Sequence, residues 1–228
     1  MRTLTVALVI SLLLCAAASA NPPFPYEQYC RVSPQDQMEH PRIIGIPSGG
    51  TYPQPYARIE VQMFDYYWNP WPNVQIQLLV DPGCANDHLC WCSNGTYTAY
   101  TNAQGIAYFY VSAGGCCERP NAWTLWLGGW YPLRYYDVTV SPAYEGAPQP
   151  GDCDVLLGDF TYFGHALITA APGCTDYDGD GRTALADFVV FGDAWGATCD
   201  RSPVPLEVLA SPSPPPPDFT VRQSPTRP

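Results

Sequence analysis

The alternation of apolar and polar positions in the middle of the chain predicts β-strands. Ile59, Val61 and Met63 alternate with polar neighbours in "ARIEVQMFD", and the same period of two recurs in "VQIQLLV". This period places alternate side chains on one face of a strand, so each run is expected to be half-buried. Shorter β-rich runs follow, namely "GTYTAYT", "GIAYFYV", "AWTLWLG" and "YYDVTV". Short strands at this spacing predict a mainly β fold, an antiparallel β-sandwich over residues 57–140.

A helical period appears closer to the end of the chain. Gly196, which can end a helix, follows a run of apolar residues at helical spacing. These residues are Leu185, Phe188, Val189, Phe191 and Trp195. The preceding segment "GDCDVLLGDFTYFGHAL" aligns with "GDGRTALADFVVFGDAW" at a constant offset of 28 residues. We therefore predict a small α-helical module of two loop–helix repeats within residues 148–199.

The loop before the second helix has the ligand spacing of a calcium site. Ca²⁺ takes six to eight oxygen ligands, which a twelve-residue loop can supply from alternating positions. Carboxylates stand at positions 1, 3, 5 and 12, and a glycine stands at position 6, where the chain turns sharply. The predicted ligand residues are Asp176, Asp178, Asp180, Arg182 and Asp187, of which Arg182 offers only its backbone carbonyl.

The loop departs from the common pattern at three positions. Asp187 at position 12 is shorter than the usual Glu, and Thr183 at position 8 stands where an aliphatic residue is usual. Ala184 at position 9 has no side-chain oxygen, so a water molecule is expected to supply that ligand. The alternative is an Asp/Gly turn without metal, in which alternating carboxylates would repel each other uncompensated. In the first repeat, Pro148 and Pro150 fall at positions 1 and 3. We therefore expect one good calcium site and a first loop that is empty or weak.

Two family resemblances follow from these motifs. The stretch "EVQMFDYYWNPWPNVQIQLLV" with "TNAQGIAYFYV" resembles invasin-type bacterial immunoglobulin-like domains, whose closing element matches Thr101, Ala103, Gly105, Ala107 and Phe109. The cysteine-bearing insertions "DPGCANDHLCWCSNG" and "GGCCERP" depart from that family. The tandem repeats resemble the dockerin domain, with its EF-hand-type calcium loops. These resemblances imply a structural or adhesive module and a helical unit that binds a cohesin-like or other surface protein.

The ends of the chain differ in composition from its centre. Residues 1–20 combine Arg2, an apolar run and the small-residue site Ala18-Ser19-Ala20, which is typical of a secretory signal peptide. Residues 21–56 are rich in Pro, Tyr and polar residues, and we expect an irregular arm. Residues 200–228 contain "SPSPPPP" and are expected to form a flexible tail. The interpretation is a secreted or cell-surface protein without a membrane span after signal cleavage.

The cysteines support export. Nine of the ten remain after signal cleavage, and many cysteines in an exported chain imply disulfides, with at least one left over. A bridge between Cys174 and Cys199 would close the second repeat across its base and is one option for the pairing. The "CWC" and "CC" motifs are interpreted as disulfide cysteines rather than metal ligands.

Charge and motif content reduce the number of function classes that the sequence supports. The formal net charge is −11, with no lysine, so no basic stripe for nucleic acid is present. No local motif of a nucleophile, zinc protease or phosphate loop is present, and we expect a non-catalytic protein. The preferred function is calcium-dependent extracellular attachment or assembly. The aromatic runs "YYWNPWP" and "WTLWLGGWYPLRYY" leave open a carbohydrate-binding accessory of polysaccharide breakdown, and a hydrolase with an unrecognised site is the other alternative.

Overall fold

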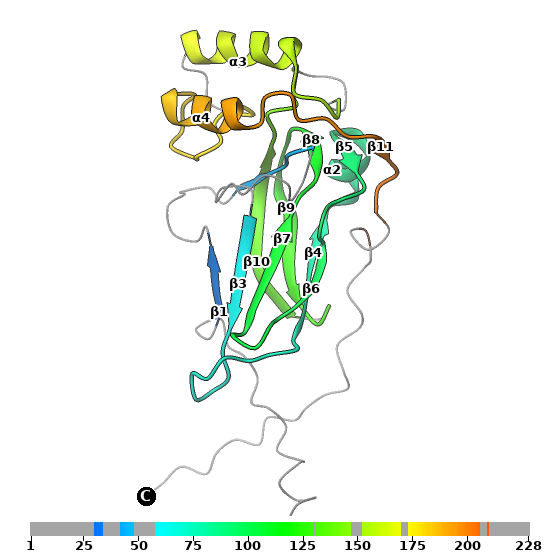
Figure 1. Cartoon of the computed structure of the whole chain (residues 1–228), viewed down its shortest axis with the longest axis vertical. Helices are drawn as coiled ribbons and strands as arrows, with labels where there is room; N and C mark the ends of the chain where they lie inside the picture. The colour runs from blue at the N-terminus through cyan, green and yellow to red at the C-terminus, as the bar shows by residue number, and fades with distance from the viewer. Residues whose placement is uncertain are drawn as a thin grey trace, which may run out of the picture.

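A computed structural model describes residues 30–33, 42–47, 58–129, 131–146, 152–169, 173–205 and Leu209. The predicted signal peptide and nearly all of the tail beyond residue 205 lie outside these residues. The described part is mainly β, as expected, and it contains two main sheets, a small third sheet and a pair of helices (Figure 1). None of its helices is both long and apolar enough to cross a membrane.

The two main sheets are formed by strands from both halves of the chain. The five-stranded sheet has the order β2 (Arg42–Ile44), β10 (Tyr131–Val140), β9 (Cys117–Leu127), β4 (Gln75–Val80) and β6 (Thr98–Tyr100). The three-stranded sheet has the order β1 (Cys30–Ser33), β3 (Arg58–Met63) and β7 (Ile106–Tyr110). The pairs within both sheets are antiparallel, except for β2 with β10, which are parallel.

A small third sheet lies at the end of the main sheets that faces the helices (Figure 1). Its strands are β11 (Arg201–Ser202), β5 (Leu89–Cys92) and β8 (Ala113–Gly115), and the short helix α2 (Pro82–Asp87) precedes β5. Asp81 caps α2 by accepting hydrogen bonds from the backbone N–H groups of Gly83 and Cys84, at 2.9 and 3.4 Å. The cysteine-rich insertion is therefore ordered secondary structure.

Side chains from both main sheets share one core. Ile59, Val61 and Met63 on β3 are buried, whereas Glu60 and Gln62 between them are half-exposed, which confirms the predicted alternation. The largest side chains of this core are Trp91, Tyr97 and Trp123, whose rings lie 5.7 to 6.3 Å apart. Burying an aromatic side chain stabilises a fold by roughly 1.5–3 kcal/mol, so this cluster is a main stabilising element.

The segment predicted to be an irregular arm contributes to both main sheets. β1 pairs with β3 from Cys30 opposite Met63, and β2 pairs with β10 from Arg42 opposite Val138. These strands contain only four and three residues, too few for a visible alternation in the sequence. Their backbone pairing and the burial of Val32 hold them in place.

The predicted helices form a pair at one end of the molecule (Figure 1). Helix α3 is Leu157–Thr169 and helix α4 is Leu185–Asp193, and Gly196 beyond α4 has a φ of +77° that suits a helix end. Their inner residues share a second core with residues of the sheets: Ile44, Ile46, Val140, Ala143, Val155, Phe163, Tyr177, Val190, Phe191, Ala194 and Ala197. The helix pair is thus packed directly onto the β-structure.

Four disulfides connect the described cysteines. Three of them fasten the segment 152–199 to the strands, and the fourth joins α2 to β9: Cys90–Cys153, Cys92–Cys199, Cys116–Cys174 and Cys84–Cys117. The suggested Cys174–Cys199 bridge is therefore wrong, because Cys174 is bonded to Cys116 and Cys199 is bonded to Cys92. Cys30 in β1 belongs to none of these four pairs.

Candidate metal centre

The loop between α3 and α4 brings three of its four predicted carboxylates together. One oxygen each from Asp176, Asp178 and Asp187 lies within 4.8 Å of the other two. Asp180 turns to solvent, where its Oδ2 atom accepts a hydrogen bond from the Arg182 Nε atom at 3.1 Å. The group therefore consists of positions 1, 3 and 12 of the loop, and position 5 stands apart from it.

Asp176 fixes the turn of the loop. Its two carboxylate oxygens accept hydrogen bonds from the backbone N–H groups of Gly179 at 2.8 Å and Gly181 at 3.0 Å. Both glycines have positive φ angles, +81° and +88°, a region that costs other residues strain. The backbone conformation thus favours glycine at the predicted turn position, Gly181. The turn directs the N–H groups of Gly179 and Gly181 towards the Asp176 carboxylate.

Asp187 joins the loop to α4. Its Oδ2 atom accepts a hydrogen bond from the Ala184 N–H at 2.8 Å, and its Oδ1 atom accepts from the N–H groups of Tyr177 at 2.5 Å and Asp178 at 3.1 Å. The side chain is fully buried, and this burial raises the pKa of Asp187 although the three backbone donors act to lower it. One carboxylate therefore links both ends of the loop at the start of the helix.

Arg42 is a member of the site that sequence reasoning missed. Its guanidinium Nη1 atom lies 3.3 Å from the Asp176 Oδ2 atom and also donates to the Asp176 backbone carbonyl. Both side chains are buried. Arg42 lies on β2, 134 residues before Asp176, so no local spacing could have connected the two. The β-structure thus supplies one positive charge to a group of three carboxylates.

The three carboxylates are side chains that could hold a hard divalent cation. Three converging carboxylates carry more negative charge than one guanidinium neutralises, and oxygen ligands suit calcium. Thr183, the departure at position 8, is buried, and its Oγ1 atom lies 2.6 Å from the Thr175 Oγ1 atom. That hydroxyl pair gives the buried polar side chain a hydrogen-bond partner.

The first repeat copies the helix start but not the acidic group. The Leu156 N–H donates to the Asp159 Oδ2 atom at 2.8 Å, the same contact that Ala184 makes to Asp187 28 residues later. Asp159 is buried, its Oδ1 atom has no hydrogen-bond partner, and burial raises its pKa to about 6. In the described part of this repeat no three acidic side chains converge.

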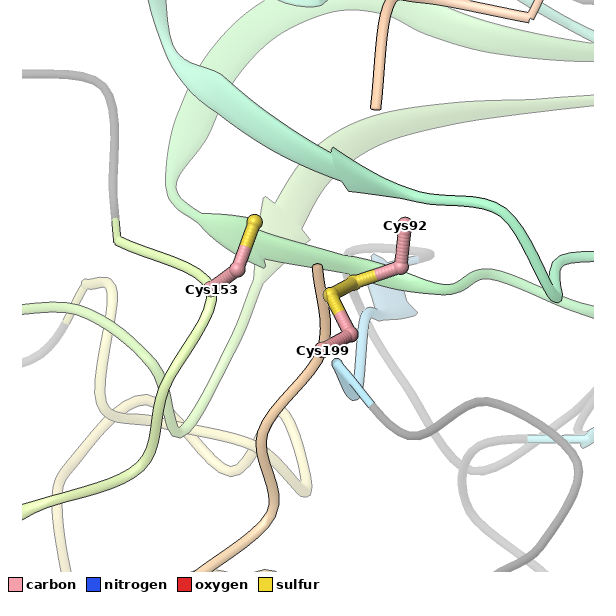
Figure 2. A group of neighbouring side chains, drawn as sticks. All are labelled: Cys92, Cys153 and Cys199. Atoms are coloured by element: carbon pink, nitrogen blue, oxygen red, sulfur yellow. A yellow bond between two sulfur atoms is a disulfide. The ribbon is translucent and has the colours of Figure 1, made fainter. Parts of the chain in front are cut away.

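A second group of potential ligands consists of disulfide sulfurs. Cys92, Cys153 and Cys199 lie close together, and Figure 2 shows the bond between the Cys92 and Cys199 sulfurs with Cys153 beside it. The Cys153 sulfur is bonded to Cys90. A disulfide sulfur is not the thiolate that a metal requires. The "CWC" cysteines are therefore structural, as predicted.

The outer face of the helix pair is apolar and open. Leu157 is 69% exposed, Leu185 is 74% exposed, and Trp195 is 48% exposed. A groove of about 450 Å³ runs between the two helices and is lined by Leu157, Phe160, Phe188, Phe191, Gly192 and Trp195. Exposed apolar surface of this kind often marks a contact surface for another molecule.

Comparisons with family models, with curated proteins and with solved structures give no match for this chain.

Proposed function

We propose that this is a non-catalytic, extracellular attachment protein in which a calcium-loaded, dockerin-like helix pair is carried on an immunoglobulin-like β-sandwich. The observation that carries the proposal is the convergence of Asp176, Asp178 and Asp187 at the start of a helix with an exposed apolar face. Bound calcium would be held by these carboxylates and would supply the positive charge that they lack. The four disulfides fit an oxidising compartment outside the cell.

The internal repeat supports the dockerin-like interpretation. Phe163 and Phe191, which are 28 residues apart, stack at the centre of the helix pair with ring centroids 5.0 Å apart. Asp159 and Asp187 cap the two helices with the same backbone contact. Equivalent residues thus occupy equivalent places in a pair of loop–helix units, and the exposed Leu157 and Leu185 correspond in the same way. The proposed partner of this face is a cohesin-like or other surface protein.

Calcium titration by calorimetry on the oxidised protein tests the proposal. We expect one strong site per chain, because within the described residues the second loop alone gathers three carboxylates. Asp178→Asn should weaken binding by at least tenfold, since it removes a charge from the group at a half-exposed position. Asp200→Asn, an exposed aspartate outside the loop, is the matched control and should leave the affinity unchanged. Absence of calcium binding, or an equal effect of both variants, would refute the calcium site.

The attachment role has its own test. The oxidised protein is immobilised and exposed to extracellular surface proteins of the producing organism, with calcium or with a chelator. We expect a partner to be retained with calcium and released by the chelator, and Leu185→Glu should prevent retention because it places a charge on the apolar face. Retention that is unaffected by both changes would exclude this face as the docking surface.

A further inference from the structure

A second exposed aromatic surface lies at the opposite end of the molecule. The loop 65–73, "DYYWNPWPN", joins β3 to β4 and is named the aromatic tip. In Figure 1 it is the teal loop at the end of the sheets that is distant from α3 and α4. It is therefore separate from the calcium loop and from the apolar face of the helix pair.

Three consecutive aromatic side chains of the tip face solvent. Tyr66 is 53% exposed, Tyr67 is 75% exposed, and Trp68 is 52% exposed. By contrast, Trp91 and Trp123 in the core are at most 2% exposed. The Tyr66 and Tyr67 rings meet edge to face, with centroids 5.4 Å apart. Rings left this exposed contribute little to the core, so their gathering in one loop points to contact with another molecule.

The tip is held in one conformation by Asp65. The Asp65 Oδ1 atom accepts hydrogen bonds from the backbone N–H groups of Tyr67 at 2.8 Å and Asn69 at 2.9 Å. The Asp65 Oδ2 atom accepts from the Asn69 side-chain amide at 3.1 Å. The Trp68 N–H donates to the Asp65 carbonyl at 3.0 Å. Since the carboxylate is occupied by the loop itself, its role is to position the rings.

The backbone of the tip is strained where the rings are presented. Trp68 has a φ of +64°, a left-handed conformation that is uncommon for a bulky residue and costs about 1 kcal/mol or more. Strain of this kind persists where the surrounding contacts impose it and is concentrated at functional sites. Phe64 supports the Trp68 ring, with centroids 5.8 Å apart. The rings are thus placed before any ligand arrives, which lowers the entropy cost of binding.

A second turn, residues 101–105, is bonded to the tip at Trp71 and Asn73 and carries exposed amide side chains. The Asn73 N–H donates to the Thr101 carbonyl at 2.8 Å, and the Thr101 hydroxyl donates to the Trp71 carbonyl at 2.7 Å, so the two loops are fastened together. The exposed polar side chains of the combined surface are amides without charge: Asn69, Asn73, Asn102 and Gln104. Residues 66–73 and 101–105 contain no charged residue at all.

This combination matches the chemistry of a neutral sugar chain. Sugar rings present C–H faces that stack on aromatic rings, and their hydroxyl groups pair with amides. Among the described residues, the basic side chain placed near the tip is Arg31, whose guanidinium lies over the Phe64 ring, 5.5 Å from its centroid. An anionic membrane or an anionic polysaccharide would therefore find no cluster of basic side chains there, on a chain with a formal net charge of −11. We propose that the aromatic tip is a carbohydrate-binding site for a neutral polysaccharide and that it acts independently of the calcium loop.

The proposal is tested with the full oxidised protein in a sedimentation assay. The probes are cellulose and chitin particles as neutral polysaccharides, polygalacturonate gel as an anionic one, and phosphatidylcholine vesicles as a membrane. We expect binding to at least one neutral polysaccharide and to neither of the other probes. Tyr67→Ala and Trp68→Ala should each weaken binding by at least tenfold, and circular dichroism should show that both variants keep the fold of the parent protein.

Two controls separate this site from the calcium-dependent one. Trp195→Ala removes a comparably exposed tryptophan from the helix pair and should leave polysaccharide binding unchanged, as should a calcium chelator. Binding to neither neutral polysaccharide, binding to the vesicles, or undiminished binding of a variant carrying both tip substitutions would overturn the proposal. Loss of polysaccharide binding on chelation would show that the two sites are not independent. None of these outcomes decides whether the loop binds calcium, which the calorimetric titration tests separately.

Discussion

At the scale of single residues, the buried pair of Arg42 and Asp176 connects the β-structure to the loop. The Arg42 guanidinium lies 3.3 Å from the Asp176 Oδ2 atom and offsets part of the negative charge of the three carboxylates when no cation is bound. Because it is positively charged, it also repels a cation that approaches the same oxygen. Removing one partner of a buried pair costs about 3–5 kcal/mol because the other charge stays buried. Arg42 is therefore expected to stabilise the calcium-free protein and to weaken calcium binding.

We predict that Arg42→Gln lowers the free energy of unfolding without calcium by roughly 2–4 kcal/mol and raises calcium affinity by about tenfold. Urea unfolding in chelator and calorimetry measure the two effects. Arg58→Gln is the control, because Arg58 forms a half-exposed ion pair with Glu60 and lies over the Tyr108 ring at 4.9 Å, and such exposed contacts are each worth about 1 kcal/mol at most. A calcium affinity that falls in Arg42→Gln would contradict this account of the guanidinium.

The buried Asp159 carboxyl should make the free energy of unfolding depend on pH. Burial raises its pKa from 3.8 to about 6, so the folded protein binds this proton more tightly than the unfolded chain does. The contribution to the free energy of unfolding is therefore full below about pH 4 and is lost as the pH rises towards 6. We predict that Asp159→Asn reduces the slope of the stability profile across this window, measured by urea unfolding at several pH values. Part of the slope should remain, because burial also raises the pKa of Asp187 and of Asp152. An unchanged slope would show that another group causes it.

At the scale of elements, the 28-residue repeat was readable from the sequence because its ligands and apolar residues lie within single loops and helices. The same locality explains why the alternating strand β3 was predicted correctly. The strands β1 and β2 were not predicted, because strands of four and three residues show no visible period in the sequence. They are held by backbone hydrogen bonds to the distant strands β3 and β10. The bridges Cys92–Cys199 and Cys116–Cys174 span 107 and 58 residues and could not be read from sequence for the same reason.

The helix pair should depend on its central ring stack. Phe163 and Phe191 are each 1% exposed, whereas Phe160 is 42% exposed at the rim. We predict that Phe191→Ala costs about 3–5 kcal/mol of unfolding free energy, because it leaves a cavity against Phe163. Phe160→Ala should cost clearly less, since water already reaches that ring. Chemical denaturation of both variants compares the two values, and equal losses would mean that the stack is not the centre of the pair.

At the scale of the whole molecule, a disulfide fastens the acidic loop 176–187 to the β-structure. Cys174 stands two residues before Asp176 and is bonded to Cys116, whereas Cys84–Cys117 joins α2 to β9, away from the loop. A cross-link restricts the chain on either side of it, so Cys116–Cys174 should hold the loop ready for the cation. The two bridges are thus expected to differ in their effect on calcium binding.

We predict that replacing Cys116 and Cys174 together by Ser lowers calcium affinity by several-fold. Either double replacement should lower the free energy of unfolding by about 2–4 kcal/mol. The matched replacement of Cys84 and Cys117 should, however, change the calcium affinity little. Calorimetry on the two double variants makes the comparison. Equal calcium affinities in both would show that the loop is positioned without its bridge.

We propose that calcium bound in loop 176–187 orders α4, and hydrogen exchange with and without calcium tests this claim. A ligand at a hundredfold excess over its dissociation constant stabilises the bound state by about 2.7 kcal/mol. Asp187 links the ligand group to the first turn of α4, so this stabilisation should reach the helix amides. We predict that chelation lowers the protection of residues 185–195 by roughly a hundredfold and leaves β9 unchanged. Equal protection of residues 185–195 in calcium and in chelator would contradict the claim.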